Sequence, residues 1–398
     1  SLDRPAMQQM IADIKAGKIS RVVSWKLDRL SRSQKDTLYL IEDVFLANNI
    51  TAVRTCHYPN DERFLDLCDE RGILVWEENH ARGLSLERMQ NHNFDRQCKD
   101  CIDEMIQNHY NHPSICVWGI SNEITISTTK RRDMLENHEL LNDLIHEMDP
   151  SRPTTLACYA MCAPFDSVAH ISDVVSWNLY LGWYTPFMWL NNLWVDYFHR
   201  RYPNRCFGYS EYGCECMPNL HSSHPFRGDQ TEEYQCKYNE FMINFFEKRP
   251  FMWGTHLWNM FDFAADARNQ GGEPGMNHKG LVTFDRKTKK DSFYLYKAWW
   301  SKEPFVHICG RRYVDRAEKK TSVKVYSNCP EITLYANSKL VGTQTGDKVF
   351  TFRIPLEGEL KLTAVCGDHS DEINIRRVKK PNPSYKLSRK KANGGNWT

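Results

Sequence analysis

The chain has 398 residues, of which 26% are charged, and its formal net charge is +2. This length suffices for one large domain and one small one, and the balanced charge argues against a nucleic-acid-binding surface over the whole chain. No apolar run approaches the ~18 residues of a membrane span, and no signal peptide opens the sequence, so we expect a cytoplasmic protein that does not contact a membrane.

Apolar periodicity and turn residues predict strands that alternate with helices over the first 300 residues. Helices are expected over 5–16, 34–48, 62–70, 94–109, 134–148, 231–247 and 293–300. Strands are expected over 19–27, 51–56, 73–76, 115–118, 154–158, 174–179, 206–209 and 251–258. Eight alternating strands are the number that a closed (β/α)8 barrel needs, so the predicted fold class is an α/β TIM barrel.

The pattern changes after about residue 302. Short strands are predicted over 323–326, 332–336, 349–354 and 360–365, separated by turn residues. This rhythm indicates a small immunoglobulin-like β-sandwich. From about residue 378 the chain is rich in Lys, Pro, Asn and Gly, which favours a flexible tail. The predicted domains are therefore 1–50, a barrel over 51–302, a sandwich over 303–377 and a tail over 378–398.

Two of the predicted strands end at a carboxylate. The run 112–123 reads HPSICVWGISNE and ends at Glu123, and the run 206–211 reads CFGYSE and ends at Glu211. Barrel enzymes place acidic catalytic side chains at the C-terminal tips of buried strands, and two carboxylates facing one sugar bond are the basic equipment of a glycosidase. The alternative is that each carboxylate only forms an ion pair.

The 14 cysteines have no framework spacing. Cys98 and Cys101 form a CxxC, but no second pair follows at the spacing of a zinc site. Reduced thiols of a cytosolic protein are the simpler interpretation, and we expect no metal and no other cofactor.

Seven motifs, in order, resemble glycoside hydrolase family 2, the β-galactosidase and β-glucuronidase family. The resemblance covers residues 51 to about 366. The motifs are AVRTCHYPND at Ala52, LCDERGILV at Leu67, NHPSICVWGISNE at Asn111, SWNLY at Ser176, YSEYG at Tyr209, HLWNMFDF at His256 and NHKGLVTFDRK at Asn277. The resemblance implies that Glu123 is the acid/base and Glu211 the nucleophile of a retaining enzyme, with carboxyls about 5 Å apart.

The resemblance also implies substrate contacts around the two carboxylates. Tyr180 would hydrogen-bond the nucleophile, or be a rim aromatic, and Trp258 would form an apolar floor under the sugar, or pack in the core. Arg54 and His57 would reach sugar hydroxyls, although an ion-pair network is an equal alternative for Arg54. Further substrate-binding residues are expected at the ends of two strands, at Asn122 and Asn178.

Asn277 and Lys279 form an Asn-x-Lys-Gly turn. In β-glucuronidases this motif grips the sugar carboxylate, as a cation and an amide donor should. The same turn occurs in sequences that resemble β-galactosidases, so it leaves the substrate open. A solvated loop lysine is the alternative for Lys279.

The first 50 residues resemble part of a serine recombinase catalytic domain, through RPAMQQMIADIKAGKISRVVSWKLDRLSRS. In that family Arg29 and Arg32 would hold the scissile phosphate. The nucleophilic serine is not in this sequence, and strand exchange requires it, so we expect no nucleic-acid partner. The segment 21–27 is instead expected to pair beside 51–56 as the first strand of the barrel.

The main hypothesis is a retaining glycosidase that hydrolyses terminal β-galactosides. We expect its activity to be impaired, because the family's domains before the barrel are not in this sequence. The alternatives are a β-glucuronidase or β-galacturonidase, a DNA-binding recombinase remnant, and a catalytically dead fusion. The expected partner is a β-linked sugar, with a homo-oligomer as a further expectation.

Overall fold

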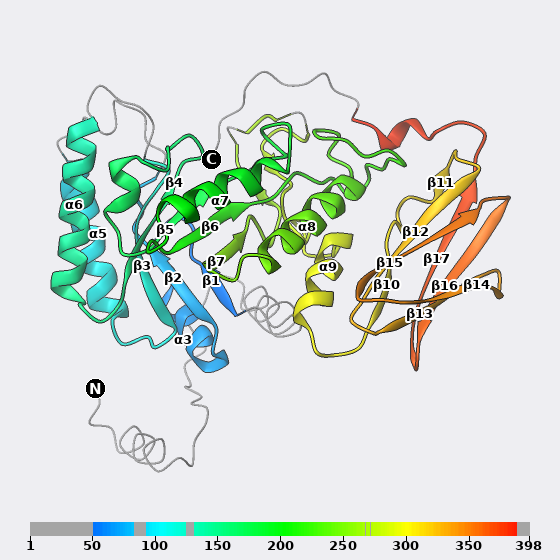
Figure 1. The fold of residues 1–398 in the computed structure, drawn as a ribbon, viewed down its shortest axis with the longest axis horizontal. Coiled ribbons are helices and arrows are strands. Elements are labelled where there is room, and N and C mark those ends of the chain that lie inside the picture. The colour runs from blue at the N-terminus through cyan, green and yellow to red at the C-terminus, as the bar shows by residue number, and fades with distance from the viewer. Residues whose placement is uncertain (1–50, 83–92, 125–130, 267, 271, 388–398) are drawn as a thin grey trace, which may run out of the picture.

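The computed structural model describes residues 51–82, 93–124, 131–266, 268–270 and 272–387. Figure 1 shows a barrel-like α/β body joined to a smaller β-sandwich. The barrel holds a parallel sheet whose strands lie side by side in chain order. These strands are β1 (Ala52–Arg54), β2 (Leu74–Glu78), β3 (Ile115–Asn122), β4 (Thr154–Cys158), β5 (Val175–Asn178), β6 (Phe207–Tyr212) and β7 (Met252–Leu257). The fold is a nearly closed TIM barrel, which confirms the predicted fold class.

Helices cover the outside of this sheet (Figure 1). They are α3 (Glu62–Arg71), α5 (Phe94–His109), α6 (Arg131–Met148), α7 (Leu190–Arg201), α8 (Glu232–Glu247) and α9 (Asp291–Trp300). Local sequence explains the ends of α3, because Asp61 accepts a hydrogen bond from the backbone N–H of Arg63 and Gly72 ends the helix with a φ of 67°. An acceptor side chain at the start and a left-handed glycine at the end are the usual caps.

Several predicted elements match the structure and one helix was missed. The helix predicted over 94–109 and the strand predicted over 154–158 coincide with α5 and β4. The missed helix, α7, begins after Trp189, which makes no capping hydrogen bond from its side chain, so the sequence carries no start signal there. The strand predicted over 19–27 and the helices predicted over 5–16 and 34–48 lie outside the described residues.

The sandwich contains two packed sheets, of order β10-β12-β15 and β11-β17-β16-β13-β14. Its strands are β10 (Val306–Ile308), β11 (Asp315–Arg316), β12 (Lys320–Ser327), β13 (Glu331–Ala336), β14 (Lys339–Thr345), β15 (Lys348–Pro355), β16 (Glu359–Cys366) and β17 (His369–Arg377). The four predicted strands correspond to β12, β13, β15 and β16. The sequence missed β14 because no residue of this edge strand is buried, so it lacks an apolar alternation.

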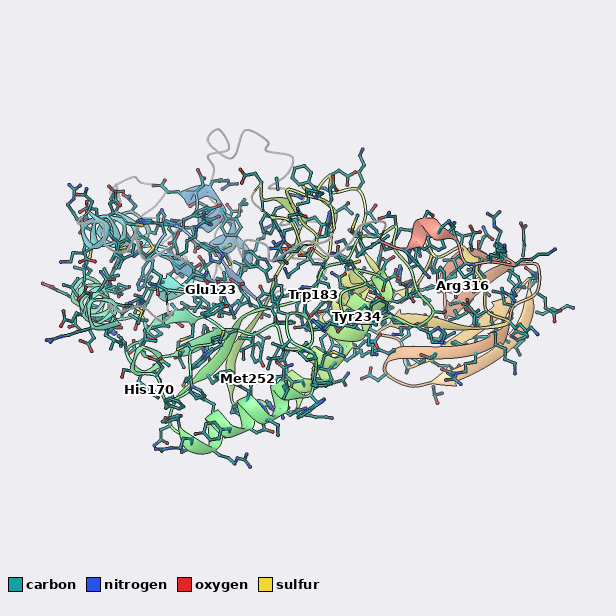
Figure 2. The ribbon with its side chains drawn as sticks, turned by 90° about the horizontal axis from the view of Figure 1, so that it is seen from above. Glu123, His170, Trp183, Tyr234, Met252 and Arg316 are labelled. Carbon is teal, nitrogen blue, oxygen red and sulfur yellow. The ribbon has the colours of Figure 1, made fainter. Side chains whose placement is uncertain are left out.

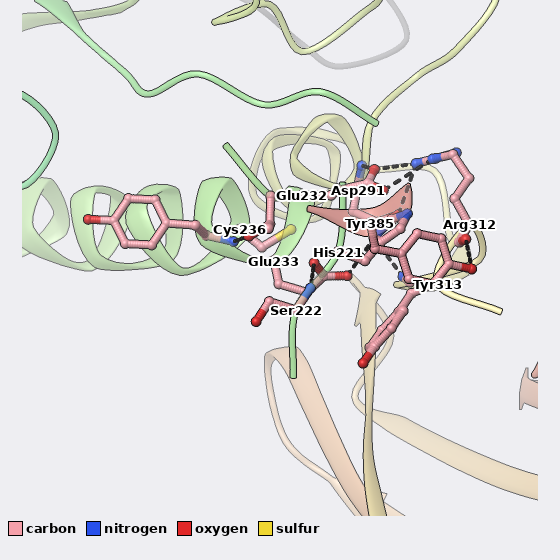
Figure 3. Close-up of polar contacts among 12 residues, drawn as sticks. His221, Ser222, Glu232, Glu233, Cys236, Asp291, Arg312, Tyr313 and Tyr385 are labelled. Carbon is pink, nitrogen blue, oxygen red and sulfur yellow. Dashed lines mark hydrogen bonds and ion pairs between the residues drawn. The ribbon is translucent and has the colours of Figure 1, made fainter. Parts of the chain in front are cut away.

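The sandwich is fixed to the barrel by buried contacts. Tyr326 of β12 is fully buried within the hydrophobic core of the barrel, and Asp291, at the start of α9, accepts hydrogen bonds from His307 Nε2 at 2.9 Å and from the backbone N–H of Gly310 at 2.6 Å. A 3-10 turn (Pro383–Tyr385) lies in the segment that the sequence assigned to a tail. The backbone carbonyl of Tyr385 accepts a hydrogen bond from His221 of the barrel (Figure 3).

Within the described ranges, no helix combines the length and the apolar character needed to cross a membrane.

Candidate active site

The C-terminal ends of the barrel strands surround a cavity of about 510 Å³. Nine of the ten residues predicted for the site line it, namely His57, Asn122, Glu123, Asn178, Tyr180, Glu211, Trp258, Asn277 and Lys279. The structure therefore brings together groups from six separate stretches of the sequence. The expected separation of about 5 Å between the two catalytic carboxyls stays a prediction.

Glu123 follows β3 directly and is labelled in Figure 2. Its φ is 58°, a left-handed conformation that is uncommon for residues with a Cβ. Asn178 Nδ2 donates to Glu123 Oε1 at 2.9 Å, and Ser210 Oγ donates to Asn178 Oδ1 at 2.6 Å. Burial and then the neighbouring Glu211 raise the pKa of Glu123 to about 7. A carboxyl with this pKa is poised to donate a proton near neutral pH.

Glu211 lies in β6 and is held at both of its oxygens. The hydroxyl of Tyr180 donates to Oε2 at 2.6 Å, and Arg54 Nη1 donates to Oε1 at 3.0 Å. Burial and then Glu211 raise the pKa of Tyr180 well above its ordinary value, so the phenol stays a neutral donor. Both bonds hold the Glu211 carboxyl in a fixed orientation, as a nucleophile would require.

Arg54 was predicted to reach sugar hydroxyls, but the structure places it beneath the cavity. Its side chain is 1% exposed and its guanidinium binds Glu78 through Nε at 2.9 Å and Nη2 at 3.0 Å. The ion-pair alternative therefore describes Arg54, whose Nη1 binds Glu211 and whose Nη2 also donates to Asn122 Oδ1 at 2.8 Å. Glu78 was not predicted from the sequence, although β2 ends in two adjacent acids, of which Glu78 is the second.

One wall of the cavity is aromatic. The rings of His57 and Trp258 stack with centroids 5.1 Å apart and an interplanar angle of 18°. His57 Nδ1 lies 3.1 Å from Glu78 Oε1 and His57 Nε2 lies 3.7 Å from Glu211 Oε1. His57 thus lies between Trp258 and the ion-pair network, and the role of Trp258 as an apolar platform for the sugar ring stays a prediction.

A cluster of opposite charges lies elsewhere in the cavity wall. Lys279 is 2% exposed, and its Nζ lies 3.0 Å from Glu215 Oε1 and 2.7 Å from the hydroxyl of Tyr184. Arg268, also 2% exposed, forms a second ion pair with Glu215, and its Nε is buried without a hydrogen-bond partner among the residues that the structure describes. Lys279 is therefore not a solvated loop lysine. We name Lys279, Arg268 and Glu215 the charge cluster.

The charge cluster carries a net positive charge. Burial would raise the pKa of Glu215, but Lys279 and Arg268 lower it to about 2, so the carboxyl is ionised. Two cations then share one anion, and both cations line the cavity. Neither Arg268 nor Glu215 was predicted from the sequence. The only local signal was Glu215 itself, four residues after Glu211 in SEYGCE.

One group near the site has the donor atoms of a metal site. Ligand atoms of Cys56, His57 and Glu78 lie within 4.8 Å of one another. The guanidinium of Arg54 already occupies both oxygens of Glu78 and lies 3.3 Å from His57 Nδ1. A buried cation in that position repels a metal ion, so these residues fit an arginine network better than a metal.

Comparisons with known proteins agree with this fold and site. Residues 34–303 match the model of glycosyl hydrolases family 2, TIM barrel domain, and residues 318–369 match a domain of unknown function, DUF4982. A "Beta-glucuronidase" of Bacteroides fragilis is 34% identical over 335 residues, which are 81% of this chain and 47% of that protein. One from Streptococcus agalactiae serotype V is 32% identical, over 68% of this chain and 46% of that protein. This chain spans less than half the length of either relative.

Similar solved structures include an FMN-binding beta-glucuronidase from Facaelibacterium prausnitzii L2-6, with a TM-score of 0.81 and 43% identity over 87% of this chain and 54% of that one. A putative beta-galactosidase from Bacteroides fragilis has a TM-score of 0.79 and 29% identity over 89% of this chain and 53% of that one.

The family match begins at residue 34, within the segment that the sequence analysis compared with a recombinase. The recombinase resemblance has no support from these matches, and residues 1–50 lie outside the described part of the chain. The family match instead covers the seven motifs and the residues that line the cavity. The chain belongs to glycoside hydrolase family 2.

Proposed function

We propose that this chain hydrolyses β-glucuronides by a retaining mechanism. The observation that carries the proposal is the charge cluster, because its surplus cation faces the cavity that holds Glu123 and Glu211. A glucuronide has a carboxylate that a galactoside lacks, and burying an unmatched cation is costly unless a ligand pairs with it. The names of the relatives also favour this alternative over the β-galactosidase that the sequence analysis put first.

The mechanism follows from the two carboxyls. Glu211 forms a bond to the anomeric carbon while the bond to the leaving oxygen breaks, and Glu123 gives that oxygen its proton. A water molecule then attacks the anomeric carbon, Glu123 takes a proton from it, and the ester to Glu211 breaks. Tyr180 and Arg54 hold the Glu211 carboxylate in place through both steps.

Nitrophenyl β-glucuronide and nitrophenyl β-galactoside test the proposal with the same leaving group. We expect kcat/KM to be higher for the glucuronide. Lys279→Gln should lower kcat/KM on the glucuronide about 10- to 100-fold, the value of a charge-assisted hydrogen bond, and should change the galactoside rate little. Lys287→Gln is the matched control, because the side chain of Lys287 is 82% exposed. A higher rate on the galactoside, or an equal loss on both substrates in Lys279→Gln, would contradict glucuronide specificity.

We infer a second candidate function, binding of FMN, from the similarity to the FMN-binding beta-glucuronidase. The observation that favours it is a cleft of about 480 Å³ between barrel and sandwich, lined by more basic than acidic residues. FMN is a phosphate monoester, so Arg316, Lys320 and Arg353 of this cleft have the charge to hold it. Titrating the chain into FMN should quench flavin fluorescence in a saturable way, and unchanged fluorescence would exclude this candidate.

A further inference from the structure

Strand β6 carries one extra residue directly before Glu211. On β5, the consecutive residues 177 and 178 pair with Tyr209 and Glu211 of β6, so Ser210 has no partner there. The pairing of β6 with β7 shifts within the same stretch. Consecutive side chains of a regular strand point to opposite faces, and an extra residue re-aims a side chain. Ser210 can therefore turn toward the same region as its neighbour Glu211.

The hydroxyl of Ser210 holds the amide of Asn178. Both side chains belong to residues that are 1% exposed, and Ser210 Oγ donates to Asn178 Oδ1 at 2.6 Å. The amide nitrogen of Asn178 donates in turn to Glu123 Oε1 at 2.9 Å and to Asn122 Oδ1 at 3.1 Å. In the described part of the chain, no other group donates to Asn178 Oδ1. The orientation of the amide therefore depends on Ser210 at one end and on Glu123 at the other.

The backbone of Ser210 is tied to the second carboxyl. Arg54 Nη1 donates to the carbonyl of Ser210 at 3.2 Å and to Glu211 Oε1 at 3.0 Å. Ser210 thus contacts, through its side chain, the group that binds Glu123 and, through its backbone, the group that binds Glu211. Ser210 does not line the catalytic cavity, so it acts on the reaction only through its neighbours.

We propose that Ser210 is a positioning residue for the general acid: its hydroxyl fixes the Asn178 amide, which in turn fixes the carboxyl of Glu123 beside the leaving oxygen. The inference rests on the proposed hydrolysis by Glu123 and Glu211, but it does not depend on which sugar is cleaved. Removal of the hydroxyl leaves Asn178 Oδ1 as a buried acceptor without a partner, which is unfavourable. The amide then rotates, and its hydrogen bond to Glu123 is lost.

The acidity of Glu123 reports on this hydrogen bond. Burial and then Glu211 raise the pKa of Glu123 to about 7, whereas the hydrogen bond from Asn178 lowers it, because it favours the ionised carboxyl. Loss of the bond should therefore raise the pKa of Glu123 further. The other titratable groups that act on Glu123 among the described residues stay in place when Ser210 is changed, namely Arg54, Lys279, Tyr159, Tyr180 and Glu211.

The pH profile of kcat/KM for Ser210→Ala tests the role of Ser210. Phenyl β-glucuronide is the substrate, because its leaving group needs the proton of Glu123, and the upper limb of the profile reports this carboxyl in the free enzyme. We expect that limb to move to higher pH by roughly 0.5 to 1, the value of one hydrogen bond. Asn178→Ala should move it in the same direction, and adding Ser210→Ala to Asn178→Ala should move it no further.

Two more variants guard against a general effect on the fold. Ser176→Ala is the matched control, because Ser176 lies on the adjacent strand β5, is 0% exposed and has a buried hydroxyl without a hydrogen-bond partner among the described residues. Its pH profile should equal that of the unaltered chain. Ser210→Cys keeps the size of the side chain but donates weakly, so it should give a smaller shift in the same direction, and it replaces Ser210→Ala if that variant does not fold.

A measurement without substrate separates this inference from the proposed function. The difference in unfolding free energy between each chain and its Glu123→Gln version, followed from pH 4 to pH 9, reports the titration of Glu123. If neither phenyl β-glucuronide nor phenyl β-galactoside is cleaved but this titration moves in the Ser210 variants, hydrolysis is wrong and the hold of Ser210 on Glu123 stands. A Ser210 variant that loses rate or stability equally at every pH, with the limb and the titration unmoved, would overturn the inference.

Discussion

Glu211→Gln is expected to lower kcat/KM on nitrophenyl β-glucuronide by roughly 10⁴-fold or more, the scale seen when a covalent nucleophile is removed. The amide cannot form the glycosyl ester, although it can keep a hydrogen bond to Tyr180. Glu123→Gln should cost about 10²- to 10⁴-fold on substrates whose leaving group needs a proton. On nitrophenyl substrates its loss should be smaller in the first step, because nitrophenolate leaves without protonation.

The control is Glu139→Gln, because Glu139 is an exposed carboxylate on α6. Its rate should equal that of the unaltered chain, and circular dichroism should show that all three variants fold. Unaltered rates in both Glu123→Gln and Glu211→Gln would show that these carboxylates only form structural contacts.

Glu123→Gln is also expected to stabilise the fold at high pH. The folded-state pKa of Glu123, about 7, lies above the ordinary value of 4.5, so the folded chain holds this proton more tightly than the unfolded chain. The stability that the proton contributes is present at low pH and is lost as the pH rises from about 4.5 to 7. At pH 8 the ionised, largely buried carboxylate costs about 3 kcal/mol, from 1.36 kcal/mol per pKa unit. Glutamine avoids this cost.

Urea unfolding of Glu123→Gln and the unaltered chain at pH 4 and pH 8 measures the effect. The variant should gain about 3 kcal/mol at pH 8 and little at pH 4. The kcat/KM of the unaltered chain should fall above about pH 7, as Glu123 loses the proton that it donates. An equal difference in unfolding free energy at the two pH values would show that burial and Glu211 do not perturb this carboxyl.

The sequence identified Glu123 and Glu211 as catalytic candidates because their signal is local, and the structure places both at one cavity. Glu123 and Glu211 each close an apolar run, and a parallel strand buried on both faces must carry such a run. The barrel followed from the same periodicity. The eighth predicted strand was assigned to residues outside the described part of the chain. Helix α7 was missed because no capping residue marks its start in the sequence.

The electrostatic partners could not be read from the sequence. Arg54 binds Glu211, which is 157 positions away, and Lys279 binds Glu215, which is 64 positions away. Only the folded barrel brings these pairs together. Whether Arg54 faces the sugar or an acid depends on Glu78, whose role no local sequence pattern indicates. The cleft at Arg316 is likewise formed by two domains, so neither domain's sequence predicts it.

Covalent trapping of the glycosyl–enzyme tests the central claim, that Glu211 is the nucleophile of a glucuronide-cleaving retaining enzyme. The chain is incubated with an activated 2-fluoro-β-glucuronide, digested and analysed by mass spectrometry. The prediction is one added fluoroglucuronosyl group on the peptide that contains Glu211, with no addition in Glu211→Gln and slower addition in Lys279→Gln. A label on another residue, or an unlabelled chain under conditions that label an intact β-glucuronidase, would contradict the account.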